Sequence, residues 1–222
     1  MIEEHNPQEI ETNALPANWA IIFTAVISIL LAGGIGFWLG SRQSAGPGTD
    51  SPDAGFARDM MTHHAQAVDM ATIIRDRTED PQIRQVALDI MLTQQAQIGQ
   101  MQGWLTVWGY PIASTDPAMS WMGTPGVMPG MATPEQLKQL RDLQGVDADG
   151  LFLQLMIIHH RGGVQMADAA LSRAKTHQVL LLAQSILDAQ TSEIELMQDM
   201  LKEKGFPPVP EEPDMLHDMN SP

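Results

Sequence analysis

The chain has 222 residues, a formal net charge of −15 and no cysteine. The lack of cysteine excludes disulfides, thiolate metal sites and thiol catalysis, and an acidic chain without a basic patch argues against nucleic-acid binding. Methionine is unusually frequent, with 16 residues, and it is both a filler of protein cores and the thioether ligand that selects copper(I).

The chain begins with a polar segment and an apolar run. Residues 1–18 are polar and acidic, and we expect them to be disordered. Residues 19–40 carry no charge and would reach about 33 Å as a helix, enough for one membrane crossing. Trp19 and Trp38 lie near its ends, as interfacial aromatic residues do. We predict an uncleaved anchor rather than a signal peptide, because the run is long and follows acidic residues.

The remaining chain divides into a linker, one folded domain and a tail. Arg42 is the only positive charge close to the apolar run, and by itself it favours a cytoplasmic C-terminal side. A flexible linker is expected at 41–52, the domain at 53–207 and an acidic, Pro-rich tail at 208–222. The tail residues Met215, His217 and Met219 could bind metal, but a solvated segment explains them better.

Cap and turn signals predict the helices of the domain. Ser51-Pro52 and Asp80-Pro81 have the N-cap and N1 pattern, Thr133 begins a capping box, and Asp147 is expected to cap a further helix. Gly109 and Gly205 are expected to end helices. The expected helices run over about 52–78, 81–108, 134–143, 148–175 and 176–204, with a loop rich in Met, Pro and Gly at 111–132.

The domain contains an internal duplication. Residues 56–111 and 152–207 align without a gap at an offset of 96 positions (152 − 56), with 18 of 56 positions identical. Both copies hold Phe-x-x-x-Met-x-x-His-His-x-x-x-Val-x-Met-Ala. One supersecondary unit is therefore used twice, and strand-like alternation is lacking. We predict an all-α fold, an antiparallel four-helix bundle built from two duplicated helical hairpins.

The His-His motif brings potential metal ligands to the apolar stripe of a helix. At 100° per residue, His63 and His64 border a stripe centred on Met60 and Ala67. The small residues Ala67 and Gly163 would let the two motif helices approach closely. The candidate metal ligands are His63, His64, His159, His160, Met60, Met70, Met156 and Met166. The expected acceptors for the ring N–H groups are Gln94, Gln97, Gln190 and Glu193.

Each candidate also has a structural explanation. A single histidine on an apolar stripe is more often a hydrogen-bonded core residue, whereas two symmetric pairs followed by methionine favour metal. Met101 and Met197 are expected to be core residues. A Gly/Pro loop has little core to fill. For its methionines, a role as accessory thioether ligands and a structural role are therefore about equally expected. The loop methionines are Met119, Met122, Met128 and Met131.

The duplicated motif resembles the domain-of-unknown-function 305 family, whose hallmark is a repeated helical hairpin with Met-x-x-His-His followed by Met-Ala. The resemblance covers roughly residues 53–207 and includes the Met-rich loop. It implies a ferritin-like bundle in an exported or membrane-anchored protein and, as in some members, copper binding through Met and His. It thus implies a periplasmic or other extracytoplasmic domain, against the signal of Arg42.

Three functions remain as hypotheses. The first is a single-pass membrane protein, anchored through residues 19–40, that binds copper for buffering or tolerance without being an enzyme; its protein partner is unknown. The second is a ferritin-like di-iron or di-manganese oxidase, which needs about four Glu and two Glu-x-x-His motifs. No such motif exists here, and the inward carboxylates are Glu193 and, marginally, Asp59. The third is a structural or interaction module whose histidines link the core.

Overall fold

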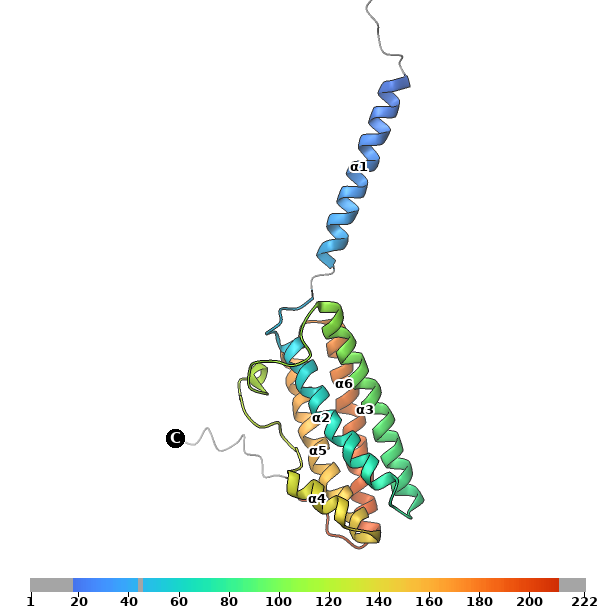
Figure 1. The fold of residues 1–222 in the computed structure, drawn as a ribbon, viewed down its shortest axis with the longest axis vertical. Coiled ribbons are helices and arrows are strands. Elements are labelled where there is room, and N and C mark those ends of the chain that lie inside the picture. The colour runs from blue at the N-terminus through green and yellow to red at the C-terminus, as the bar shows by residue number, and fades with distance from the viewer. Residues whose placement is uncertain (1–17, 44–45, 212–222) are drawn as a thin grey trace, which may run out of the picture. The chain divides into compact units, whose positions relative to one another are not determined.

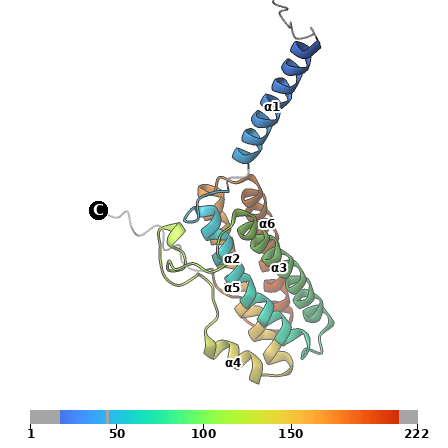
Figure 2. The ribbon, with the colours of Figure 1, turned by 45° about the horizontal axis from the view of Figure 1, so that its top comes forward.

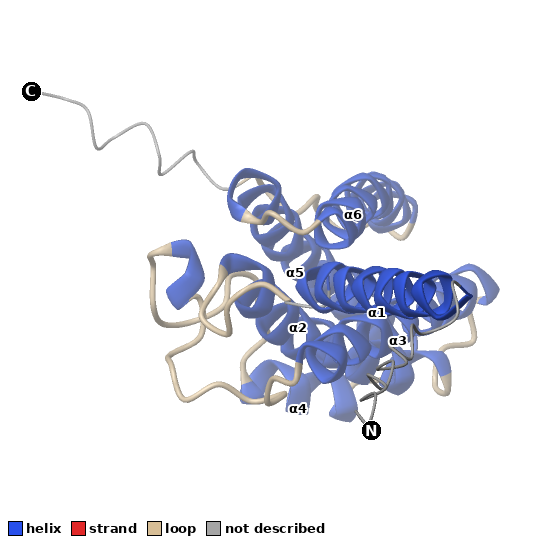
Figure 3. Ribbon diagram, turned by 90° about the horizontal axis from the view of Figure 1, so that it is seen from above, coloured by secondary structure: helices blue, strands red, loops and turns tan. Residues whose placement is uncertain are grey.

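The computed structural model describes residues 18–43 and 46–211, and in these residues it is helical without strands (Figure 3). They contain six α-helices and one short 3-10 helix. The chain divides into two compact units, residues 1–45 and 46–222. The predictions for the first 17 residues and for the tail from 212 onward, Met215, His217 and Met219 included, lie outside the described residues.

The first unit is represented by helix α1, Asn18–Gln43. Its segment Ile21–Trp38 has a mean hydropathy of 2.2, and its large apolar side chains, among them Phe23 and Phe37, are exposed. In length and composition this helix could cross a membrane. A signal sequence near the N-terminus would have the same properties.

The first hairpin of the second unit begins and ends as its cap signals predict. Helix α2, Pro52–Arg75, starts at Ser51, whose side chain accepts a hydrogen bond from the Ala54 N–H. Helix α3, Pro81–Trp108, starts at Asp80 and ends at Gly109, which has a φ of 74°. Only glycine adopts this left-handed conformation without strain. Helix α2 ends at Arg75, about three residues before the predicted end at Thr78.

The second half of the unit contains η1, α4, α5 and α6. Helix η1 is Ser120–Met122, and α4, Pro134–Asp142, has the predicted Thr133 capping box. Helices α5, Gly145–Arg173, and α6, His177–Glu203, follow. The prediction that Asp147 caps α5 is wrong. The chain enters this helix through Gly145, so Asp147 lies in the first turn, where its charge faces the positive end of the helix dipole.

Packing pairs α2 with α3, α5 with α6, and α2 with α5, as the ribbons show (Figure 1). Helix α4 contacts α2 and α5 (Figure 2). The core has two clusters of buried residues. One joins the end of α2 to the start of α5 and includes Met70 and Met156, and the other joins the start of α2 to the end of α5 and includes Met60 and Met166. Helices α2 and α5 therefore run in opposite directions.

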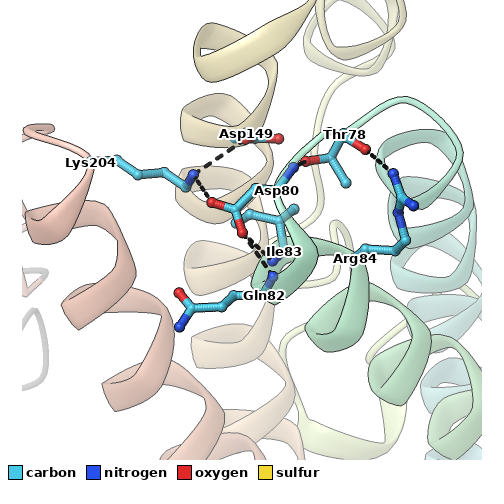
Figure 4. Close-up of polar contacts among 7 residues, drawn as sticks. All are labelled: Thr78, Asp80, Gln82, Ile83, Arg84, Asp149 and Lys204. Carbon is cyan, nitrogen blue, oxygen red and sulfur yellow. Dashed lines mark hydrogen bonds and ion pairs between the residues drawn. The ribbon is translucent and has the colours of Figure 1, made fainter.

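Aspartates at the start of α2 and of α3 tie the two hairpins together. Asp53 accepts hydrogen bonds from the backbone N–H groups of Lys175, at 3.1 Å, and Thr176, at 2.7 Å, in the α5–α6 connection. Its repeat equivalent, Asp149, lies 3.3 Å from the Lys204 ammonium, which also pairs with Asp80 at the start of α3 (Figure 4). These contacts fix the hairpin ends and leave the middle of the unit for the histidines.

Candidate metal centre

The four motif histidines form a fully buried polar layer between the two apolar clusters. His63, His64, His159 and His160 each have 0 % exposed side-chain surface, and none of them belongs to either cluster. Across the α2–α5 contact, the rings of His63 and His159 lie 3.8 Å apart between centroids, at an interplanar angle of 32°. The structure therefore brings the two copies of the predicted motif together.

Every ring uses its Nε2 in a hydrogen bond. The Nε2 atoms of His64 and His160 lie 2.7 Å from Gln97 Oε1 and Glu193 Oε2. The Nε2 of His63 lies 3.1 Å from the Pro129 carbonyl oxygen. The Nε2 of His159 lies 3.0 Å from the backbone carbonyl oxygen of His63. Carbonyl and carboxylate oxygens only accept hydrogen bonds, so Nε2 carries the proton. The expected roles of Gln97 and Glu193 as acceptors are thereby confirmed, whereas the same prediction for Gln94 and Gln190 is wrong, because their amide oxygens accept no ring N–H.

The opposite nitrogen, Nδ1, has no partner within the protein in any of the four rings. All four Nδ1 atoms are buried, as are the unpartnered side-chain amide atoms of Gln94 and the amide oxygen of Gln190. A neutral imidazole with its proton on Nε2 presents a lone pair on Nδ1. Because buried polar atoms are nearly always satisfied, four open acceptors on these rings fit a bound metal ion or ordered water.

Burial favours the neutral form of His63, His64 and His159 at physiological pH. Desolvation lowers the pKa of His63 to about 4 and that of His64 to about 3, and neighbouring histidines contribute in the same direction. It also lowers the pKa of His159 well below its usual value. A metal binds the neutral imidazole, so no proton has to be displaced from His63, His64 or His159 at pH 7.

The loop segment 129–132 covers the layer. The Pro129 carbonyl accepts the His63 hydrogen bond, and Gly130 packs so closely on α5 that a Cβ there would lie 2.5 Å from the Ile158 carbonyl oxygen. The Gln66 side chain bonds both the N–H and the C=O of Ala132. A groove of about 800 Å³ opens beside this covering segment, lined in part by Arg161, Gly162 and Val209.

The four motif methionines are buried but do not lie in one layer with the rings. Met60 and Met166 belong to one apolar cluster, and Met70 and Met156 to the other. They flank the histidines as two pairs. In the described part of the chain, no group of three or more His, Asp or Glu side chains is arranged to hold a metal ion. A metal in this layer would therefore need a thioether or a rotation of the rings.

The remaining methionines divide into core and loop residues. Met101 and Met197 are fully buried core residues, as predicted. Met119 is 1 % exposed and has a φ of 65°, unusual for a residue other than glycine. Its N–H donates to the Asp59 carboxylate at 2.7 Å. The other loop methionines are partly exposed, namely Met122, Met128 and Met131.

The covering segment was not anticipated from the sequence, although a signal for it exists. Where the first copy has Gln66 and Ala67, the second has Gly162 and Gly163. Glycine costs about 1 kcal/mol relative to alanine inside a helix, so two of them in α5 indicate a close approach. A Cβ at Gly162 would lie 2.1 Å from the Pro129 oxygen, and one at Gly163 would lie 2.1 Å from Gln190 Oε1.

Comparison with known proteins gives the same assignment from sequence and structure. The sequence model of a family described as "Domain of unknown function (DUF305)" matches residues 53–201. A DUF305 protein from Streptomyces coelicolor, whose description assigns it provisionally to the secreted proteins, is 48% identical. Its structure has a TM-score of 0.72 and covers 74% of this chain and 100% of its own. A DUF305 fragment from Deinococcus radiodurans is 34% identical, with a TM-score of 0.59, and covers 68% and 96%.

Two further similarities concern copper and a virus. CopM in its Cu(II)-bound form is 26% identical, with a TM-score of 0.55, and covers 68% of this chain and 96% of its own; CopM has also been solved in a Cu(I)-bound form. Protein L153 of Acanthamoeba polyphaga mimivirus, described as uncharacterized, is 41% identical over 49 residues. That match covers 22% of this chain and 32% of the viral protein.

Proposed function

The chain belongs to the DUF305 family, and on this premise we propose that it binds copper at the buried histidine layer. The observation that carries the proposal is the set of four buried Nδ1 atoms without a protein partner, each on a ring whose Nε2–H is already held. That arrangement is typical of metal-bound histidine, in which the second nitrogen donates to a carbonyl or carboxylate. The copper-bound forms of CopM support the choice of metal.

The ligand set combines imidazoles with thioethers. Imidazole accepts either copper oxidation state, and thioethers select copper(I). Both methionine pairs lie on the same two helices as the rings, and copper binding by both ligand types would require these side chains to move towards one another. The proposed ligands are His63, His64, His159, His160, Met60, Met70, Met156 and Met166, with Met119, Met122, Met128 and Met131 as accessory thioethers.

The proposal includes the organisation and location of the chain. Residues 19–40 form a single membrane anchor and 41–52 a linker, followed by a duplicated, ferritin-like four-helix bundle at 53–207 and a tail at 208–222. The domain lies outside the cytoplasm and buffers copper or hands it on. The exposed apolar surface of α1 and the description of the Streptomyces relative support this location. Sites without thiolate remain functional in an oxidising compartment.

Copper retention by the full chain in detergent tests the proposal. The test variant replaces all four histidines by glutamine, whose side-chain NH₂ can take over the Nε2 hydrogen bond while the Nδ1 lone pair is lost. Met101→Leu is the matched control in the apolar core. After loading with copper(I) and desalting, the wild type and the control should keep copper and the glutamine variant should lose it, with unchanged circular dichroism.

Other outcomes assign the histidines a different role. If the glutamine variant retains as much copper as the wild type, the site lies at the loop methionines. If the wild type retains none, the histidines are structural links of the core and the proposal is wrong.

A further inference from the structure

The two copies of the motif differ in the group that holds the outer histidine. Gln97 and Glu193 occupy the same repeat position (97 + 96 = 193), and each lies 2.7 Å from the Nε2 of its histidine. The geometry is the same, but one acceptor is a neutral amide and the other a carboxylate.

Glu193 lies at the edge of the layer. Its side chain is 27% exposed, whereas the ring of His160 is fully buried. The carboxylate is therefore partly solvated at the edge of the layer, and its effect reaches the interior through the ring. A negatively charged acceptor polarises the ring N–H more strongly than an amide does, which increases the basicity of the opposite nitrogen. That nitrogen, His160 Nδ1, has no protein partner.

We propose that Glu193 is a positioning residue that makes His160 the strongest copper(II) donor of the layer. The inference rests on the proposed copper site and adds a preference for oxidation state to it. A nearby negative charge stabilises a divalent ion more than a monovalent one, because the Coulomb energy scales with the charge of the ion. His64, which is held by the neutral amide of Gln97, has no such charge beside it. This effect therefore does not make His64 favour copper(II) over copper(I).

Reciprocal exchange of the two acceptors tests the inference in the full chain. The variants are Glu193→Gln, Gln97→Glu and the double exchange. Glu195→Gln is the matched control, because Glu195 is exposed on the same helix and its loss changes the net charge equally. Competition with chelators gives the dissociation constants for copper(II) and copper(I) separately, and electron paramagnetic resonance reports the nitrogen ligands of copper(II).

The expected result is specific to one oxidation state. Glu193→Gln should weaken copper(II) binding about ten- to a hundredfold, while copper(I) binding changes less than about threefold. Gln97→Glu should strengthen copper(II) binding, and the double exchange should return it towards the wild-type value. The copper(II) spectrum should change in Glu193→Gln and not in Glu195→Gln.

Two results would overturn the inference without touching the copper site itself. One is wild-type copper(II) affinity in Glu193→Gln, and the other is an equal loss for both oxidation states. A wild-type chain that binds no copper would overturn the proposed function together with this inference.

Discussion

Replacing Gly162 by alanine tests the close fit of the covering segment on α5. The new Cβ would lie 2.1 Å from the Pro129 carbonyl oxygen and 3.0 Å from the Gly130 nitrogen. These are backbone atoms, so a side-chain rotation cannot relieve the clash. We expect the segment to lift from α5, which would break the hydrogen bond between the His63 Nε2–H and the Pro129 oxygen.

Three terms set the size of the effect. Overpacking costs about 1–3 kcal/mol, and an unpaired buried ring N–H costs about 1–3 kcal/mol. Alanine recovers about 1 kcal/mol of helix propensity relative to glycine. With the middle of each range, the free energy of unfolding should fall by about 3 kcal/mol.

Urea unfolding of the full chain in detergent, followed by circular dichroism, measures this loss. Gly99→Ala is the control, because no atom lies within 4 Å of its added Cβ in α3. It should stabilise the protein by about 0.5–1 kcal/mol. Hydrogen exchange should also speed up in residues 129–132 of the Gly162 variant and stay unchanged in the control. A Gly162 variant with wild-type stability and wild-type exchange would refute the account of this contact.

Two further predictions concern charge. Lowering the pH from about 6.5 towards 4 should decrease stability, because unfolded imidazoles take up protons in this range while those of His63, His64 and His159 resist protonation; for His63, whose pKa is about 4, the loss approaches about 3 kcal/mol. Urea midpoints that do not change across this range would contradict it. Lys204→Met should cost about 2 kcal/mol, because Asp149 and Asp80 lose the cation that they share. Adding Asp149→Asn should restore part of that stability, and a double variant as unstable as the single one would disprove the pairing with Asp149.

The sequence predicts most helix boundaries because their signals are local. Ser51, Asp80 and Thr133 each satisfy the first turn of a helix with their own side chains. At Asp147 the same reasoning fails, because a glycine with positive φ starts the helix two residues earlier. When the start of a helix depends on backbone conformation, no capping side chain marks it in the sequence.

The site was predictable only as far as helix periodicity reaches. The repeat placed the four histidines inward and predicted Gln94, Gln97, Gln190 and Glu193 as acceptors for their ring N–H groups. Gln97 and Glu193 make these bonds, and Gln94 and Gln190 do not. It did not predict the hydrogen bond from His159 to the His63 carbonyl, nor the one from His63 to Pro129. These contacts join segments 96 and 66 positions apart and depend on how closely the helices and the loop approach. The motif methionines fall into two separate clusters because α2 and α5 run in opposite directions. Met60 and Met166 belong to one cluster, and Met70 and Met156 to the other.

The aspartate ties between the hairpins have a consequence for the order of events during synthesis. Asp53 emerges from the ribosome long before its partners Lys175 and Thr176, which follow 122 and 123 positions later. Asp80 is likewise synthesised long before its partner Lys204, which follows 124 positions later. The first hairpin cannot complete these contacts without the second, so the unit should fold in one cooperative step only after nearly the whole domain has been made. Until then the nascent chain exposes its apolar stripes, and chaperones that hold unfolded segments would have the longest time to act on the first hairpin.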